Sequence, residues 1–169
     1  MLKTARLLLR KARPGDLDDL HAIYGNARAM EFWSSPPDRT RDKTLERLER
    51  QLASEPPLTY FVLDLDGVAI GNAGMWRPYE IGFILHPDHW RKGYVREAMM
   101  AIVPHIWQVS DAPMLTADAD PKNEASVGCL RALGFRETGT ARNTYCVDGV
   151  WTDSVYFALP RPADQRARG

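Results

Sequence analysis

A short basic turn between an apolar strand and an amphipathic helix is the part of the sequence best suited to bind an anion. In residues 80 to 107, Arg91, Lys92 and Gly93 follow the strand, and Arg96 stands in the first turn of the helix. A helix start carries unpaired backbone N–H groups and the positive end of the helix dipole, and both attract phosphate oxygens. A ligand can approach the backbone closely at Gly93, which has no side chain. The spacing predicts a diphosphate site, with a solvated basic turn as the alternative. The residues expected to contact phosphate, chiefly through their backbone, are Lys92, Gly93, Tyr94, Val95 and Arg96.

Two histidines and the two cysteines do not form the pattern of a metal site or of a nucleophile. His86 and His89 flank Pro87 without a matching set of carboxylates or thiols, so we expect no bound metal ion. Cys129 stands in the middle of a short predicted helix, where most cysteines are small core residues, and we do not expect it to carry an acyl group. Both Cys129 and Cys146 are expected to be reduced thiols.

The size and charge of the chain limit the classes of function. Its 169 residues suffice for one domain with a substantial core, so we expect a single domain over residues 1–160 and a disordered tail over residues 161–169. The 22 basic and 22 acidic residues leave no net field that would draw the protein to nucleic acid or to an anionic membrane. The first apolar run is interrupted by Arg6 and Arg10, which fits neither a signal peptide nor a membrane span. We therefore expect a cytoplasmic protein without a nucleic-acid or membrane partner.

The N-terminal third is expected to form one strand and two helices. Alternating apolar residues predict a strand over residues 4–12, which Pro14-Gly15 stops. Asp16 is expected to cap a first helix that ends near Gly25. A second helix, capped by Thr40, follows an aromatic loop. The residues expected to pack this second helix are Leu45, Leu48 and Leu52.

The middle of the chain carries the clearest local signals. Strands over residues 60–65 and 68–76 flank an Asp66-Gly67 turn, which is typical of a β-hairpin. A third strand over residues 80–85 leads to the basic turn. The helix after Gly93 has a regular apolar stripe, but Pro104 removes a backbone donor, so we expect a kink or an early end there.

The last part of the chain predicts three more strands and a helix. These elements are a strand over residues 114–119, a helix over residues 123–133, and strands over residues 135–141 and 150–159.

The stretch DPKNEASVGCLRALGF, which follows the basic turn, makes the assignment more specific. It places Asn123 and Ser126 at the start of a short helix that closes on Gly134-Phe135. Together with the turn, this order resembles the GNAT acyltransferase superfamily. The segments TARLLLRKARPGD and 149–159 look like its Rim-type branch, the ribosomal-protein N-terminal acetyltransferases, and the resemblance covers residues 3–160. It implies a single α/β (α+β) domain with a mixed, mostly antiparallel sheet of about seven strands, splayed at the cofactor site and flanked by about four helices.

The sequence departs from the superfamily pattern at three places. Trp90 and Val95 stand where the first signature prefers Arg/Gln and Gly/Ala, although a tryptophan at the first place is familiar in the Rim branch. A phosphate cradle built from backbone N–H groups does not need those side chains. Leu130 stands where many GNAT enzymes have a tyrosine that acts as general acid, so the usual proton donor is absent.

The resemblance implies acetyl-CoA as co-substrate, with direct attack of an amine on the thioester. Glu80 is the expected general base, because it begins the strand that leads to the thioester and matches a catalytic glutamate in some GNAT enzymes. The alternative is that Glu80 pairs with an arginine at the strand end. Backbone N–H groups near Ile84 or Leu85 are expected to stabilise the developing oxyanion.

Three further residues are implied near the reacting groups. Asn123 is expected to contact the cofactor. Ser126 matches a serine that Rim-type enzymes are suggested to use toward the departing thiolate, and the alternative is an ordinary role at a helix start. Tyr145 is a substitute acid, or else a packed or substrate-facing aromatic residue.

Loop aromatics are often recognition surfaces, so Trp33 and Trp76 are expected to line the acceptor pocket, or else to cover the core. The expected reaction is acetylation of an α-amino group on a protein or peptide. Acetylation of a small-molecule amine and a catalytically silent acyl-CoA sensor are the alternatives. Rim-type relatives are often dimers, so a homodimer is an open expectation.

Overall fold

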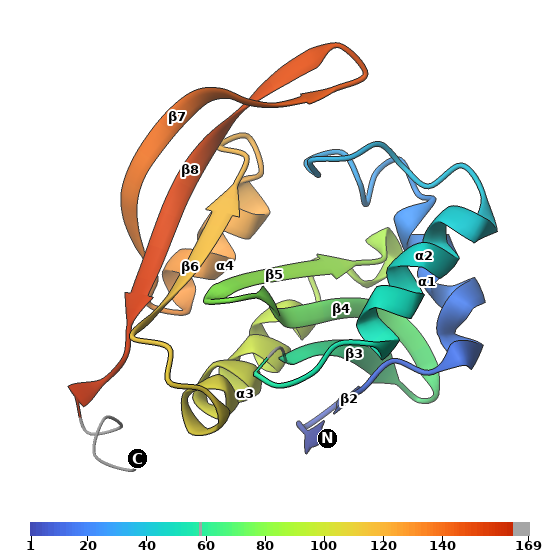
Figure 1. The fold of residues 1–169 in the computed structure, drawn as a ribbon, viewed down its shortest axis with the longest axis horizontal. Coiled ribbons are helices and arrows are strands. Elements are labelled where there is room, and N and C mark those ends of the chain that lie inside the picture. The colour runs from blue at the N-terminus through green and yellow to red at the C-terminus, as the bar shows by residue number, and fades with distance from the viewer. Residues whose placement is uncertain (58, 164–169) are drawn as a thin grey trace.

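The computed structural model of the protein describes residues 1–57 and 59–163, in which the chain forms four α-helices and one eight-stranded sheet (Figure 1). Most of the predicted disordered tail, residues 164–169, lies outside the described residues. No helix in the described part of the chain is long and apolar enough to cross a membrane. The strands are β1 (Leu2–Lys3), β2 (Leu8–Arg10), β3 (Thr59–Leu65), β4 (Val68–Arg77), β5 (Glu80–Leu85), β6 (Met114–Ala119), β7 (Arg136–Val147) and β8 (Val150–Pro160). The helices are α1 (Leu17–Tyr24), α2 (Arg41–Leu52), α3 (Tyr94–Val109) and α4 (Glu124–Ala132).

The sheet has the order β1-β2-β3-β4-β5-β6-β8-β7 and divides into two halves between β5 and β6. Neighbouring strands from β1 to β5 are antiparallel, and so are β6, β8 and β7. β5 and β6 are parallel, and in the described residues their ladder consists of one pair, Glu80 and Thr116. Beyond that pair the two strands separate, as Figure 1 shows. The predicted mixed and splayed sheet is confirmed, and the short β1 raises its strands to eight.

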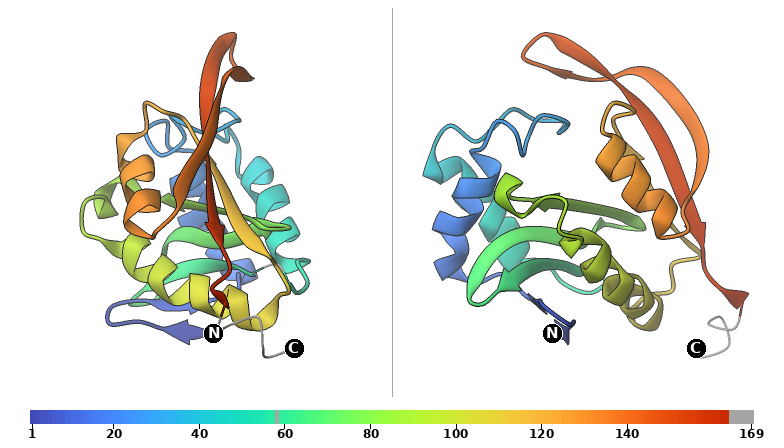
Figure 2. Two further views of the ribbon diagram at one scale, coloured as in Figure 1. Left: turned by 90° about the vertical axis from the view of Figure 1, so that its left-hand side faces the viewer. Right: turned by 180° about the vertical axis from the view of Figure 1, so that it is seen from behind.

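The helices cover opposite faces of the sheet (Figure 2). Alternation along β5 directs Ile81 and Leu85 into the core that includes α3, while Ile84 packs with Leu20 and Leu48 of α1 and α2. The two faces of β5 therefore belong to two separate apolar clusters, which fix its orientation.

The first strand and its following turn differ from the prediction. The strand predicted over residues 4–12 is reduced to Leu8–Arg10, since Thr4 and Leu7 form a turn in which the Thr4 N–H donates to the Leu7 carbonyl. α1 forms as predicted, with Asp16 at its N-cap position, but the Asp16 side chain makes no hydrogen bond to the start of the helix. Its carboxylate instead accepts bonds from the Arg10 guanidinium and from the Arg13 N–H.

α2 begins as predicted, because the Thr40 side chain accepts a bond from the Lys43 N–H at 3.4 Å. Its packing was predicted incorrectly in part. Leu48 is fully buried, whereas Leu45 and Leu52 are 37% and 43% exposed. Only a narrow stripe of α2 packs against the rest of the protein, and this stripe cannot bury all three leucines.

α3 continues through Pro104 to Val109, so the predicted early end is wrong. Pro104 lies on the exposed side of the helix, and Ile102 and Ile106 on either side of it are fully buried. Burial of this apolar stripe outweighs the missing backbone donor.

The C-terminal elements appear in the predicted order. α4 and β6 match their predicted ranges closely, and β7 extends beyond Ala141 to Val147. The β7–β8 hairpin consequently projects past the rest of the domain, opposite the loop between α1 and α2 (Figure 1).

Candidate active site

The start of α3 forms an open backbone cradle. Gly93 caps the helix in the left-handed region at φ 80°, after Arg91 at φ 61°. The first helical bond runs from the Glu97 N–H to the Gly93 carbonyl at 3.0 Å. Among the described residues, nothing accepts a hydrogen bond from the N–H groups of residues 92 to 96. Because such groups need an acceptor, the predicted cradle has the donor set of an anion site.

The turn before the cradle is fixed by Trp90, one of the departures from the superfamily signature. Its indole Nε1 donates to the Leu85 carbonyl at 2.8 Å, which ties the turn to the end of β5. Burial, followed by the charges of Lys92 and His86, lowers the pKa of His89. No group of three or more His, Cys, Asp or Glu in the described chain could hold a metal ion.

Where β5 and β6 separate, they leave a gap between the two halves of the sheet. The edge of β5 that faces this gap carries backbone groups that could hold an oxyanion. The His86 N–H donates to the Ile70 carbonyl of β4, so the even-numbered residues of β5 direct their backbone toward β4. The Ile84 carbonyl follows this pattern, since a Cβ added to Gly71 would lie 2.3 Å from it. The N–H groups of Phe83 and Leu85 therefore point toward β6. Of the two predicted oxyanion residues, alternation favours Leu85 over Ile84.

Glu80 forms an ion pair at the point where β5 and β6 meet. Its Oε2 lies 2.5 Å from Nη2 and 3.0 Å from Nε of Arg77, and its side chain is 18% exposed. Arg77 also lies over the ring of Trp76, with Cζ 4.6 Å from the ring centroid. The structure thus contains the predicted alternative, a strand-end pair with arginine.

Trp76 lies on the same face of the sheet as Glu80. It is 47% exposed, and a Cβ added to Gly82 would lie 3.3 Å from its Cδ1. The indole therefore covers Gly82 of β5 beside the gap, with nearly half of its surface exposed.

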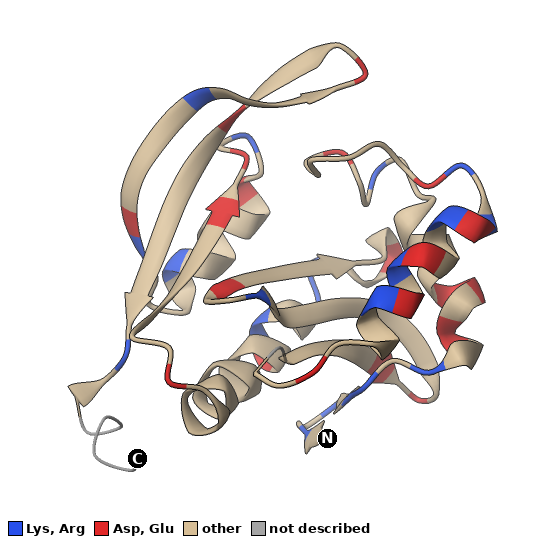
Figure 3. Ribbon diagram, in the orientation of Figure 1, with Lys and Arg blue, Asp and Glu red and all other residues tan. Residues whose placement is uncertain are grey.

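A second carboxylate, Asp118 of β6, reaches the same face and was missed by the sequence reasoning. It accepts a hydrogen bond at 3.1 Å from the hydroxyl group of Tyr145 on β7. Burial, followed by the nearby Asp118 charge, raises the pKa of Tyr145 to about 12, so this tyrosine is protonated at neutral pH. Figure 3 shows acidic positions on both sides of the gap, on β5 and on β6. The available signal was alternation: Asp118 stands between Ala117 and Ala119, which are both buried.

The start of α4 follows β6 and lies on the β6 side of the gap (Figure 1). The Asn123 side chain caps the helix by accepting a bond from the Ser126 N–H at 3.1 Å. The Ser126 side chain is half-buried, and its hydroxyl group has no hydrogen-bond partner in residues 1–57 and 59–163. Leu130 is 1% exposed in the main core, so an apolar side chain fills the place of the missing tyrosine. Burial raises the pKa of Cys129 to about 11, which argues against a thiolate nucleophile.

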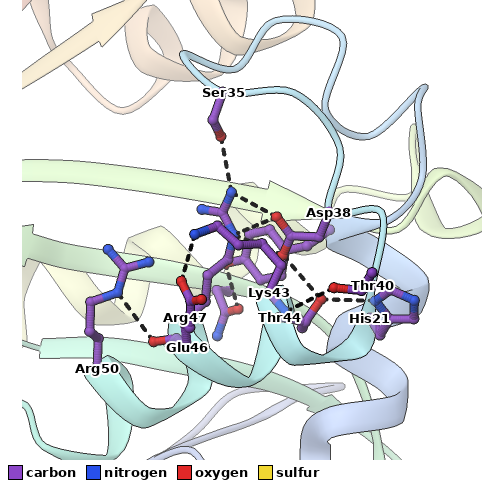
Figure 4. A network of polar contacts seen from close by, with 11 residues as sticks. His21, Ser35, Asp38, Thr40, Lys43, Thr44, Glu46, Arg47 and Arg50 are labelled. Atoms are coloured by element: carbon purple, nitrogen blue, oxygen red, sulfur yellow. Dashed lines mark hydrogen bonds and ion pairs between the residues drawn. The ribbon is translucent and has the colours of Figure 1, made fainter.

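The loop between α1 and α2 lies opposite the β7–β8 hairpin (Figure 1). Trp33 is half-buried and packs edge-on against Tyr24 at 5.9 Å between ring centroids. Figure 4 shows how the loop is held: Arg47 of α2 donates to both oxygens of the buried Asp38 and to the Ser35 hydroxyl group. Asp38 also accepts from Thr44 at 3.0 Å. This network orders the loop opposite the β7–β8 hairpin.

Comparisons with known proteins agree with this arrangement. A protein-family model described as an acetyltransferase (GNAT) domain matches residues 6–136. The uncharacterized N-acetyltransferase YoaA of Bacillus subtilis (strain 168) is 22% identical over 97% of this chain and 98% of its own length. The ribosomal protein uS5-alanine N-acetyltransferase of Escherichia coli (strain K12) is 28% identical over 53% of this chain and 46% of its own length. The crystal structure of spermidine N-acetyltransferase from Vibrio cholerae in complex with CoA and spermine has a TM-score of 0.79 and 21% identity, covering 92% of this chain and 96% of that one.

Proposed function

Since the GNAT family model matches residues 6–136, this chain belongs to the GNAT acetyltransferase family, and we propose that it acetylates the α-amino group of a peptide or protein. The chain is an N-acetyltransferase that uses acetyl-CoA as co-substrate. The proposal concerns the acceptor and the residues that act on it.

The start of α3 fits the phosphate end of this co-substrate. The free N–H groups of residues 92 to 96 and the left-handed Gly93 leave the backbone accessible, and Lys92 and Arg96 add exposed positive charge. When bound, acetyl-CoA supplies an acyl group activated as a thioester. Leu85 and Phe83 would direct N–H groups toward the charge that develops on the acyl oxygen. Asn123 and Ser126, on the other side of the gap, are the proposed contacts from α4.

The observation that carries the proposal is the Asp118–Tyr145 pair beside the gap. Glu80 is already engaged by Arg77, while Asp118 has only a neutral hydroxyl group as its described partner. Asp118 is therefore the better carboxylate to accept a proton from the attacking amine. A C–N bond would form and the C–S bond would break, and the protonated Tyr145 would supply a proton to the sulfur atom. Asp118, which then holds the amine proton, would return it to Tyr145 along their hydrogen bond. Ser126 is the second candidate for this proton.

The weakness of an aspartate as a base favours an α-amino acceptor. An α-amino group has a pKa of about 7.7 to 8.0, whereas a lysine side chain has one of about 10.4, so the former is partly neutral near pH 7. The ordered loop after α1 and the projecting β7–β8 hairpin lie opposite each other (Figure 1), and we propose that an extended chain end binds between them. Trp33 and Trp76 are the proposed aromatic contacts for this chain end.

A small polyamine is the second candidate acceptor. The carboxylates of Glu80 and Asp118 both act on the pKa of Tyr145, so two acidic groups converge near the reacting position. Such a pair attracts a cation, although the guanidinium of Arg77 offsets part of its charge.

One assay separates these readings. The release of free CoA thiol is followed with acetyl-CoA and a panel of peptides, amino acids, polyamines and other small amines. Turnover with peptides alone supports the proposal, and turnover with polyamines alone supports the second candidate. Cofactor binding without thiol release for any amine would contradict both and would indicate a sensor.

A further inference from the structure

A basic feature outside the predicted site lies beside the cradle, in the turn between β1 and β2. The Thr4 hydroxyl group donates to Glu97 of α3 at 2.6 Å, and the backbone N–H and Nε of Arg6 donate to the same carboxylate at 2.8 and 2.7 Å. Burial alone would raise the pKa of Glu97, but these bonds hold it below its ordinary value, so the carboxylate is ionised. The turn is thereby fastened to the helix whose start forms the cradle.

This ion pair leaves the outer part of the Arg6 guanidinium available. Within the described chain, Nη1 and Nη2 of Arg6 donate to no acceptor. The guanidinium lies over the ring of Tyr94, with Cζ 4.3 Å from the ring centroid. A Cβ added to Gly93 would lie 3.6 Å from Nη2. The free nitrogens therefore stand directly beside the residue that opens the cradle.

A shallow groove continues from Gly93 between the N-terminal turn and α3. Lys3, Arg96 and Glu97 are among its lining residues. Because the Glu97 charge is neutralised by Arg6, the remaining side chains give the groove a positive character. A basic groove that runs from a helix start has the chemistry of a phosphate site.

We propose that Arg6 is a phosphate-binding residue of the acetyl-CoA site and that Glu97 positions it. This inference rests on the proposed function, because it takes CoA as the ligand. The shared chemistry is a phosphate group, which can be the diphosphate or the 3′-phosphate of CoA. A guanidinium presents two parallel N–H donors to phosphate oxygens, and its stacking on Tyr94 fixes their direction.

The test compares the affinities of three ligands for the full-length protein by calorimetry or tryptophan fluorescence. These ligands are CoA, dephospho-CoA without the 3′-phosphate, and acetyl-pantetheine without any phosphate. Arg6→Gln is expected to weaken CoA binding about tenfold and to leave acetyl-pantetheine binding unchanged. Arg41→Gln is the matched control, because Arg41 of α2 forms an exposed pair with Asp18 of α1, and the CoA affinity of this variant should stay at the wild-type value.

The affinity for dephospho-CoA shows which phosphate group Arg6 binds. If Arg6→Gln still weakens the binding of dephospho-CoA, Arg6 binds the diphosphate. If Arg6→Gln leaves the binding of dephospho-CoA unchanged, Arg6 binds the 3′-phosphate. Either result supports the proposal.

Two more variants separate binding from folding. Arg6→Lys keeps the charge but lacks the two parallel N–H donors of the guanidinium, so its CoA affinity should lie between those of the wild type and Arg6→Gln. Glu97→Gln keeps the guanidinium but weakens its anchor, and a loss of about threefold is expected.

Two results would overturn the inference: unchanged CoA affinity in Arg6→Gln, or an equal loss for acetyl-pantetheine, which would indicate general distortion. A wild-type protein that binds no CoA would instead refute the proposed function, so the two failures are distinguishable.

Discussion

The Tyr145 hydroxyl group donates a 3.1 Å hydrogen bond to Asp118, and this bond joins the outer hairpin to the strand beside the gap. Asp118→Asn should lower kcat by about 100-fold, because an amide cannot accept the proton of the amine. Steady-state kinetics with the best acceptor of the panel measure this effect. Asp111→Asn, an exposed aspartate in the loop after α3, is the control.

Glu80→Gln provides the contrast, since Glu80 was the base expected from the sequence. In the structure it neutralises Arg77 at the junction of the two half-sheets. We expect Glu80→Gln to change kcat less than Asp118→Asn does. A larger loss of kcat in Glu80→Gln than in Asp118→Asn would return the role of base to Glu80.

Tyr145→Phe should lower kcat about tenfold with little change in the KM for acetyl-CoA, because it removes a proton donor and leaves the cradle intact. Burial and the Asp118 charge raise the pKa of Tyr145 to about 12, so the wild-type rate should show no decline from tyrosine ionisation up to pH 9. Ser126→Ala is the informative comparison. A larger loss there than in Tyr145→Phe would assign the proton to the serine.

Alkaline pH should destabilise the protein through a buried tyrosine. Burial raises the pKa of Tyr24 to about 12, and its hydroxyl group donates to Asn72 at 3.0 Å. A raised pKa in the folded state gives stability that is complete below the unfolded value near 10 and is lost as the pH rises toward 12. The contribution is on the order of 2 to 3 kcal/mol. Urea unfolding measures the free energy of unfolding at pH 8 and at pH 11. The difference between the two values should be smaller for Tyr24→Phe than for the control Tyr156→Phe, which replaces a tyrosine that is 37% exposed.

The Cys129 thiol should be unreactive near neutral pH. Since burial raises the pKa of its thiol to about 11, an alkylating reagent at pH 7.5 should modify the exposed Cys146 first. Cys129→Ala should keep kcat within about twofold, because the proposed mechanism has no acyl-enzyme. Detection of an acetylated Cys129 by mass spectrometry during turnover would contradict this expectation.

Acid should destabilise the protein through Asp16. Burial alone would raise its pKa, but bonds from Arg10 and from the Arg13 N–H hold the pKa below the ordinary value. A lowered pKa gives stability that is present above about pH 4 and is lost as the pH falls through the folded value. Asp16→Asn should cost about 3 kcal/mol at pH 7 by denaturant unfolding, since it breaks a buried pair. The control Asp18→Asn breaks the exposed pair with Arg41 and should change little.

Much of the fold followed from local patterns in the sequence. Asp66-Gly67 between alternating strands predicted the β3–β4 hairpin, and the apolar stripe after Gly93 predicted α3, because in both cases neighbouring residues determine the outcome. Pro104 misled the prediction for the same reason: its local cost is real, but burial of Ile102 and Ile106 outweighs it.

The proposed catalytic face was harder to predict because it depends on strand order. Asp118 and Tyr145 are far apart in the sequence, and they meet only because β6 and β7 both flank β8. The pairing of Glu80 with Arg77 was within reach of the sequence, since a turn of two residues separates them. Arg6 gave no signal of its own, because its place beside Gly93 arises from the packing of the N-terminal turn on α3.

The one-pair ladder between Glu80 and Thr116 in the described residues has a thermodynamic consequence. It leaves the inner edge of β5 with N–H groups that a ligand between the half-sheets can satisfy. A ligand that binds only the folded state raises stability by mass action, by about 2.7 kcal/mol at a concentration of 100 times its Kd. We therefore expect the melting temperature to rise with the logarithm of CoA concentration, so that the thermal stability of the protein depends on the concentration of its cofactor.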